Sequence, residues 1–368
     1  MRCFLCYRQL RRSRRERKEY ELRNITAVFL IVVSVAAASG EFATGGAELL
    51  KFKGYLIAAF NGYGEQNADP DNGFDVLATI EWCPRLNNRL DAKIAFKSQP
   101  TRYTGSIEDL SLTTEDIVVN MHICQAATFS MGHFKRPFGY CYTRSGSSMY
   151  FRDRAMLCGI FGNFGKRDIG ANMALHFGFA DIDLAYTNGA GDNEPEDDSH
   201  KSFTARAVLE PVNGIQVAGA FGSYSENADT TGEGTVRATA LDFYSVINLP
   251  VSDTVKLFFS GEYITAGEPV ENNADWNNAS GYAATLLADF DLDGNVIQAI
   301  RPAVRYESNS PGYTGDDPKN DAGAVDFCLS IDVFSSRNTI QTGMRNYLFQ
   351  NTEENGYSDM YFTWRMKF

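Results

Sequence analysis

The chain has 368 residues, of which 44% are apolar and 13% aromatic, and its 34 basic and 46 acidic side chains give a formal net charge of −12. This composition is too apolar and aromatic for a disordered chain, and the acidic balance argues against non-specific nucleic-acid binding. No apolar run reaches the about 18 residues of a spanning helix, which excludes a polytopic helical membrane protein, and the many Phe, Tyr and Gly residues favour an all-β fold.

Residues 1–40 have the features of a targeting segment. A long basic stretch over residues 1–24 precedes an apolar run over 25–38, and small residues follow at 36–40. This order predicts a secretory signal peptide with a long n-region, which leaves 41–368 as the exported chain. A short membrane anchor is the alternative, but the run is too short to span a bilayer.

The exported part repeats one pattern, in which apolar residues alternate with polar or small ones. Clear examples occupy residues 74–82, 90–97, 203–209 and 325–333. A period of two predicts strands with one apolar and one polar face, and a length near ten residues suits a tilted strand that crosses a bilayer.

Short and long connections alternate between these segments. Short turns are predicted at 87–88, 181, 212–214, 252–253 and 336–338, with weaker signals near 125 and at 289–295. Long loops are predicted at 61–73, 98–113, 137–166, 188–201, 224–236, 266–280, 307–321 and 349–358. Seven turns and eight loops predict an all-β, 16-stranded antiparallel transmembrane β-barrel with short periplasmic turns and long extracellular loops. If the weaker turns are wrong, fourteen strands remain.

The last segment, 360–368, alternates apolar and polar residues and ends on Phe368. A terminal aromatic on an amphipathic strand is similar to the signal that the bacterial β-barrel assembly machinery reads, so we expect that machinery to be a partner. The alternative is a soluble exported β-sandwich or propeller that binds carbohydrate and buries its apolar faces in a dry interior.

Three motifs resemble the phosphate-selective (O/P-type) porin family of bacterial outer membranes. They are the segment 132–139 (GHFKRPFG), the segment 167–170 (RDIG) and the segment 188–191 (NGAG), and His133 departs from the family's Gln. The residues that carry the resemblance are Gly132, Phe134, Lys135, Pro137, Phe138, Arg167, Asp168, Gly170, Asn188 and Gly189. The resemblance implies a sixteen-stranded, trimeric, anion-passing channel. We expect such a channel to pass small hydrophilic solutes across the outer membrane, with lipid and lipopolysaccharide as partners.

The charge distribution predicts which side chains line such a channel. The longest loop, 137–166, is the one that folds into the lumen of large porins, and it carries four basic side chains against Asp153 alone. Together with three strand arginines, the predicted anion path is Arg144, Arg152, Arg154, Lys166, Arg206, Arg301 and Arg305. Rings of basic side chains favour anions. Alternatively, these arginines pair with lumen carboxylates such as Asp326 and Asp332 and only stiffen the barrel.

The cysteine positions are compatible with two redox states. Cys141 and Cys158 fall in one long loop and can form a disulfide, or the exported cysteines are reduced thiols buried on strands. No cysteine or histidine spacing suggests a metal site, and no catalytic motif is present, so we expect neither a cofactor nor enzyme activity. The sequence therefore predicts an anion-leaning porin, with a non-conducting receptor or adhesin barrel as the alternative.

Overall fold

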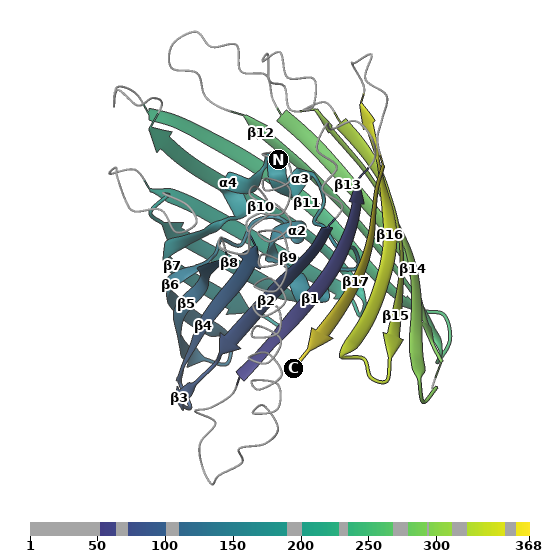
Figure 1. The fold of residues 1–368 in the computed structure, drawn as a ribbon. Helices are drawn as coiled ribbons and strands as arrows, with labels where there is room; N and C mark the ends of the chain where they lie inside the picture. Colours follow the sequence, from purple (N-terminus) through teal and green to yellow (C-terminus); the bar gives the residue numbers. More distant parts are fainter. Residues whose placement is uncertain are drawn as a thin grey trace, which may run out of the picture.

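The computed structural model describes residues 52–63, 73–100, 110–189, 201–227, 235–267, 279–292, 294–310, 322–349 and 358–368. The predicted signal peptide and most residues of the predicted extracellular loops other than 137–166 lie outside these ranges. Within them the chain forms a β-barrel (Figure 1).

The strands follow one another around the barrel in chain order. They are β1 (Phe52–Tyr63), β2 (Gly73–Trp82), β3 (Arg85–Asn87), β4 (Leu90–Pro100), β5 (Leu110–Cys124), β6 (Ala127–Lys135), β7 (Arg167–His176), β8 (Ala180–Thr187), β9 (Ser202–Val212), β10 (Ile215–Asn227), β11 (Thr235–Pro250), β12 (Val255–Gly267), β13 (Ala279–Asp291), β14 (Ile297–Ser310), β15 (Ala322–Val333), β16 (Asn338–Phe349) and β17 (Ser358–Lys367). Neighbours pair antiparallel, and β1 pairs with both β2 and β17, which closes the sheet. Closure satisfies the backbone hydrogen bonds without leaving an edge.

The barrel has sixteen strands, because β2 and β3 are two parts of one strand. Both parts pair with β4, and the Ala92 N–H donates to the carbonyl oxygen of Pro84, which lies between them, at 3.0 Å. Proline lacks the N–H that an uninterrupted strand would use, so the ladder breaks there. The prediction of sixteen strands is confirmed and the alternative of fourteen is wrong.

Within the described residues, the short turns agree with the predicted ones except at one position. The turn predicted at Asp181 is formed instead by residues 177–179, and Asp181 lies in β8. Gly178 takes a φ of +78°, which glycine adopts without steric cost, so the reversal occurs at the glycine. Asp181 accepts a hydrogen bond from His176 Nδ1 across the strand pair at 2.8 Å.

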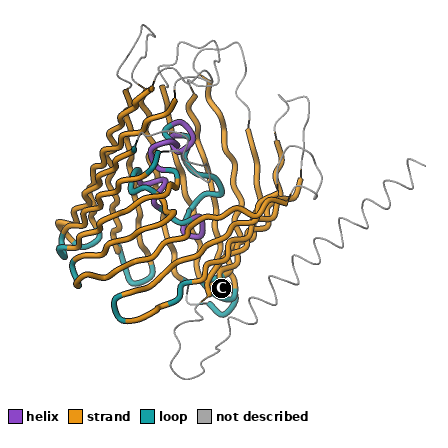
Figure 2. Tube along the Cα trace, turned by 90° about the vertical axis from the view of Figure 1, so that its left-hand side faces the viewer, coloured by secondary structure: helices purple, strands orange, loops and turns teal. Residues whose placement is uncertain are grey.

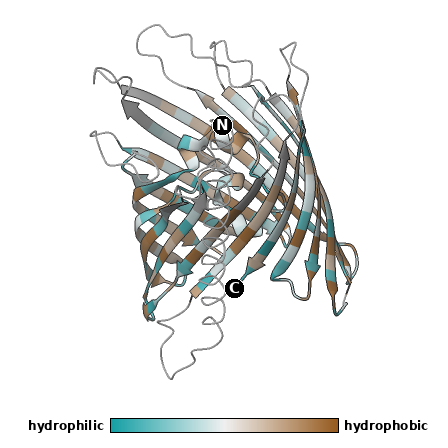
Figure 3. Ribbon diagram, in the orientation of Figure 1, coloured by the Kyte–Doolittle hydropathy of each residue, from teal (hydrophilic) through white to brown (hydrophobic). Residues whose placement is uncertain are grey.

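The strands place apolar side chains outside and polar ones inside. On β17, Met360 and Phe362 are 61% and 50% exposed, whereas Thr363 and Arg365 are 1% and 4% exposed. Figure 3 shows the alternation of hydrophobic and hydrophilic residues along the strands. A soluble sandwich or propeller requires the opposite arrangement, so that alternative fold is wrong. Among the described residues, no helix is long and apolar enough to cross a membrane.

The loop between β6 and β7, here called the lumen loop (residues 137–166), lies inside the barrel (Figure 2). It contains α2 (Tyr140–Thr143), the 3-10 turn η3 (Gly146–Ser148), α3 (Leu157–Ile160) and α4 (Gly162–Gly165). Phe138, Leu157, Phe161 and Phe164 of the loop pack in one cluster with Ile264 and with small residues of β10, β11 and β13. The apolar and small residues that β10–β13 place inward are therefore covered by the loop.

Gly222 of β10 shows how closely the loop approaches the wall. A Cβ atom at this position would lie 3.1 Å from both Phe138 and Phe164, whose ring centroids are 5.4 Å apart. A second cluster, Phe151 with Tyr244, Val246, Phe258 and Leu287, extends the contact toward β13. The loop thus packs on the wall formed by β10–β17, and beyond it reaches β1, where a Cβ atom at Gly146 would lie 2.7 Å from the Tyr55 hydroxyl.

Candidate functional site

The lumen loop is tied to the wall by side chains of the strands that bond to its backbone. Glu262 of β12 accepts hydrogen bonds from the Cys141 N–H at 3.2 and 3.3 Å, and Glu307 of β14 accepts one from the Met156 N–H. Arg365 of β17 donates to the carbonyl oxygen of Met149 at 2.8 Å, and Gln341 of β16 donates to that of Tyr150. Such bonds tie the loop backbone to the wall at these four positions.

A buried network of four charges supports the middle of the loop. Arg305 contacts Asp326 at 2.5 Å and Glu307 at 3.0 Å, and Arg345 contacts Glu307 at 2.7 Å. Arg305 also donates to the carbonyl oxygen of Asp153 at 3.2 Å, and Arg345 donates to that of Arg154 at 3.3 Å. Buried charges are stable only when they are paired in this way, so the network and the loop depend on each other.

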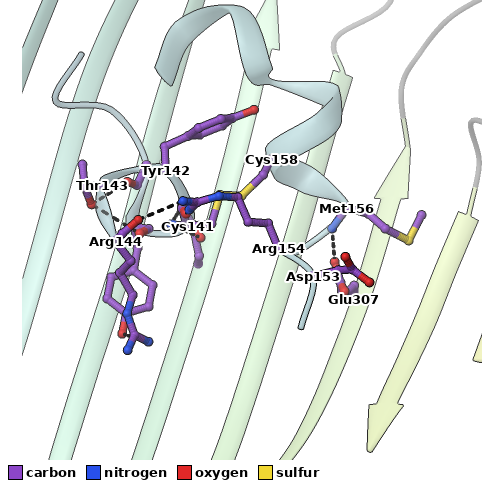
Figure 4. The surroundings of a disulfide bond; sticks show 12 residues. Cys141, Tyr142, Thr143, Arg144, Asp153, Arg154, Met156, Cys158 and Glu307 are labelled. Carbon is purple, nitrogen blue, oxygen red and sulfur yellow. Dashed lines mark hydrogen bonds between the residues drawn. A yellow bond between two sulfur atoms is a disulfide. The ribbon is translucent and has the colours of Figure 1, made fainter. Parts of the chain in front are cut away.

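The disulfide predicted as one of two alternatives is present. Cys141 in α2 is bonded to Cys158 in α3 across a sequence separation of 17, and Figure 4 shows the bond beside Arg154. Closing a loop of this length in the unfolded chain stabilises the folded one by about 3 kcal/mol in the chain-entropy model. Of the other described cysteines, Cys83 is half-buried, Cys124 is exposed and Cys328 is buried, and none of the three is part of a disulfide.

A cavity of about 1010 Å³ lies between the lumen loop and the wall formed by β1, β2 and β4–β7. Its described basic lining is Lys53, Lys93, Lys97, Lys135, Arg152, Arg154, Lys166, Arg167 and Lys367, and its described acidic lining is Glu81, Glu115, Asp116 and Asp153. Basic side chains are in excess in a chain whose net charge is −12. The cavity therefore has the opposite charge balance from the whole chain.

On the wall side of the cavity the charges form an alternating ladder across five strands. Lys53 contacts Glu81 at 3.1 Å, Glu81 contacts Lys93 at 3.6 Å, and Lys93 contacts Asp116 at 2.6 Å. Arg167 completes the ladder, with Asp116 at 2.8 Å and Glu115 at 3.3 Å. Each cation of the ladder has a carboxylate partner, so the ladder alone leaves little net charge.

The loop side differs, because Lys135 and Arg154 are held by carbonyl oxygens. Lys135 Nζ donates to the carbonyl oxygens of Tyr142 at 3.1 Å and Arg144 at 3.3 Å. Arg154 donates to the carbonyl oxygens of Cys141 and, at 2.9 Å, of Arg144. Within the described part of the chain, neither cation forms an ion pair with a carboxylate. Carbonyl dipoles hold a cation in place without neutralising its charge, so the Arg154 guanidinium keeps positive charge at the cavity.

The other predicted loop residues lie in different surroundings. Arg152 and Lys166 line the large cavity, where Arg152 lies 6.0 Å above the Tyr361 ring and Lys166 donates to Asn163 at 3.0 Å. Arg144 lies over the ring of Tyr150 at 4.5 Å and lines a smaller cavity of about 60 Å³ between the loop and β12–β14. Arg152, Arg154 and Lys166 therefore line the large cavity, whereas Arg144 lines only the smaller one, which Arg154 also lines.

The three predicted strand arginines are paired, as in the alternative considered for them. Arg206 contacts Asp183 at 2.6 Å, and Arg301 contacts Asp289 at 2.9 Å and Asp332 at 2.8 Å, while Arg305 belongs to the four-charge network. None of the three is among the described residues that line the large cavity.

The residues of the first motif, 132–139, lie at the end of β6 and the beginning of the lumen loop. Phe134 packs with Val118 and Ala185, and Phe138 is fully buried in the cluster under the loop, two residues beyond the buried Arg136. Pro137 lies between Arg136 and Phe138, where the chain leaves β6. Burial lowers the pKa of Arg136 to about 10, and its guanidinium lies 5.7 Å from the centroid of the Tyr224 ring.

The other motif residues have roles in the backbone geometry. A Cβ atom at Gly170 would lie 2.2 Å from the carbonyl oxygen of Tyr186. Asp168 accepts hydrogen bonds from its neighbour Ile169 at 2.8 Å and from Gly189 at 2.6 Å, where φ is +99°. The Asn188 N–H donates to the carbonyl oxygen of Ile169 at 2.9 Å.

The C-terminal residue takes part in closing the barrel. Phe368 exchanges two backbone hydrogen bonds with Gly54 of β1, each of 3.0 Å, so the last residue of the chain is joined to the first described strand. Its role as an assembly signal stays a prediction.

Sequence reasoning missed most of the wall cations as lining residues. The alternation of the strands places Lys93, Lys97 and Lys367 on the lumen face, because each alternates with apolar residues that face outward. For Lys135, the sequence indicates only that it belongs to the motif at 132–139. Its position beside the loop carbonyls depends on how the loop folds, for which the sequence pattern gives no signal.

Comparisons with solved structures support this description of the fold. OmpF of Salmonella typhi, in a complex with daunomycin, matches with a TM-score of 0.58 and 13% identity over 87% of this chain and 97% of that one. An anion-selective porin of Comamonas acidovorans matches with a TM-score of 0.57 and 9% identity over 87% and 99%. OmpT of Vibrio cholerae, in a trimer form, matches with a TM-score of 0.54 and 12% identity over 87% and 99%.

No protein-family model matches the sequence, and no curated protein matches it. At these identities the structural matches establish the fold alone. The chain therefore has a porin-like fold, a closed antiparallel barrel of sixteen strands whose lumen is narrowed by an internal loop.

Proposed function

We propose that the protein is a porin of a bacterial outer membrane, through which small hydrophilic solutes diffuse passively with a preference for anions. The observation that carries the anion preference is the pair Lys135 and Arg154, which face the cavity without a carboxylate partner among the described residues. Basic groups in a narrow, low-dielectric passage attract anions and repel cations. The apolar outer surface of the barrel suits contact with lipid.

The direct test is the reversal potential of the purified protein in a planar bilayer under a KCl gradient. We expect the sign that corresponds to chloride passing more readily than potassium. A preference for potassium would contradict the proposal. A folded, inserted barrel that shows no conductance would favour the alternative, a receptor or adhesin.

Phosphate-type anions are the finer part of this proposal. Arginine and lysine both bind phosphate oxygens, and Arg152, Arg154 and Lys166 approach the cavity from the same loop. Replacing chloride by phosphate at constant ionic strength tests this part. Transient blocking of the chloride current by phosphate is expected if it binds, and an unchanged current indicates a general anion pore.

The location and assembly complete the proposal. Residues 1–40 direct export, Phe368 is read by the barrel assembly machinery, and the mature barrel forms a homotrimer among lipopolysaccharide and lipid. The trimer form of the structurally similar OmpT of Vibrio cholerae supports the oligomeric state. Cross-linking in outer-membrane fractions tests it, and a monomer alone in such fractions would contradict it.

A further inference from the structure

The Cys141–Cys158 disulfide joins two short helical turns that have separate attachments to the wall. Cys141 belongs to α2, and its N–H donates to Glu262. Cys158 belongs to α3, and it packs in the apolar cluster that includes Ile264 and Ala283 of the wall. The disulfide fixes the spacing between α2 and α3 directly.

Arg154 links the same part of the loop by hydrogen bonds. It lies between the two cysteines in sequence and donates to the carbonyl oxygens of Cys141 and Arg144 (Figure 4). The carbonyl oxygen of Arg144 also accepts the hydrogen bond from Lys135. Lys135 and Arg154 are thus held by backbone oxygens of Cys141, Tyr142 and Arg144, which lie at one end of the disulfide or within three residues of it.

We propose that the Cys141–Cys158 disulfide positions the cations that select anions, so that reduction of the bond lowers the anion preference of the channel. The proposal rests on the proposed function, in which Lys135 and Arg154 favour anions. Arg154 and Lys135 repel each other, and without the disulfide α2 can separate from α3 and carry the shared carbonyl oxygen away. The two cations then move apart, and the positive potential at the narrow part of the cavity falls.

The redox step requires a dithiol as the reductant. The S–S bond breaks and accepts two electrons and two protons, which yields two cysteine thiols, while the dithiol is oxidised to a cyclic disulfide. Cys141 is half-buried and Cys158 is 6% exposed, and both lie in the lumen loop. A soluble dithiol that enters the channel therefore approaches the bond from the side of Cys141.

The test compares reversal potentials of single inserted channels before and after addition of dithiothreitol. The variants are the double substitution Cys141→Ser with Cys158→Ser and, as the matched control, Cys124→Ser, an exposed free thiol at the end of β5. For the wild type and the control, we expect dithiothreitol to lower the chloride-to-potassium permeability ratio at least about twofold. The double variant is expected to show the lower ratio from the start and no response.

The outcomes separate this inference from the proposed function. If the oxidised wild type has no anion preference, the proposed function fails. If it has one and the inserted double variant keeps the same ratio, the disulfide has no positioning role and this inference fails. If the double variant does not insert, thiol labelling of the denatured wild type, isolated without reductant, tests whether the disulfide is present. Labelling of Cys141 and Cys158 would contradict the disulfide and this inference. If both cysteines are protected, the inference stands or fails on whether dithiothreitol lowers the permeability ratio of the wild type.

Discussion

Lys135 and Arg154 donate hydrogen bonds to the same acceptor, the carbonyl oxygen of Arg144, at 3.3 and 2.9 Å. One cation comes from the end of a barrel strand and the other from the middle of the lumen loop. Carbonyl dipoles, including those of Tyr142 and Cys141 that each accept one further bond, do not cancel the charge of a cation, so this relationship places positive potential where the loop faces the cavity. It also makes the potential depend on the conformation of the loop backbone.

Removing either cation should weaken the anion preference. Lys135→Gln and Arg154→Gln each keep a polar side chain but remove the basic group. We expect the chloride-to-potassium permeability ratio, measured from the reversal potential under a KCl gradient, to fall about twofold in each variant. Lys256→Gln is the control, because Lys256 is an exposed lysine at the start of β12 and is not among the described lining residues. Equal ratios in all three variants would contradict the assignment.

Breaking the four-charge network should destabilise the barrel. Arg345→Met leaves Glu307 buried with one of its two cations missing. Loss of one partner from a buried network costs about 3–5 kcal/mol in the free energy of unfolding, whereas removing both partners costs less. Urea unfolding in lipid vesicles should therefore give a higher free energy of unfolding for the double variant Arg345→Met with Glu307→Leu than for the single variant Arg345→Met. Asp253→Asn in an exposed turn serves as the control, and a single variant as stable as that control would refute the expectation.

Much of the barrel could be predicted because its two patterns are local. Alternation along a strand such as β17 assigns each side chain to lipid or lumen, and connection lengths show which side of the membrane each end faces. The error at Asp181 has a local cause as well. Both Gly178 and Asp181 are turn-forming residues, and the glycine with positive φ determined the position.

The pairing of the strand arginines could not be predicted in detail. Arg305 meets Asp326 because the two residues are opposite each other in the register between β14 and β15, and registers depend on the whole sheet. The location of the uncompensated charge could not be predicted from the sequence either. Arg154 and Lys135 meet only because the loop folds back on the end of β6, which is decided by packing and hydrogen bonding inside the lumen.

The two faces of β5 offer a matched test of the membrane orientation. Val119 is 47% exposed on the outer surface, and the next residue, Asn120, lines the cavity. Val119→Lys puts a charge on the lipid-facing surface and should cost about 2–4 kcal/mol if it lies near the middle of the bilayer. Asn120→Lys places the same charge in water beside Asp91 and should cost far less. Folding in vesicles followed by urea titration measures both, and equal costs would argue against lipid contact at this face.

Gly132 should be irreplaceable for a reason unrelated to solute passage. Its φ is +136°, and a Cβ atom there would lie 2.1 Å from the carbonyl oxygen of Ile117 on the neighbouring strand. Gly132→Ala must either break the pairing of β6 with β5 or shift both strands. Because the residue lies just before the lumen loop, the shift would also displace Lys135.

We expect Gly132→Ala to destabilise the barrel by about 1–3 kcal/mol or more and to reduce the yield of folded protein. Gly159→Ala is the matched control, since a Cβ atom at that position meets nothing within 4 Å and the residue lies in α3. The measurement is the fraction of each variant with heat-modifiable gel migration after refolding into detergent. Wild-type yield and stability for Gly132→Ala would show that β5 and β6 do not approach each other as closely as described.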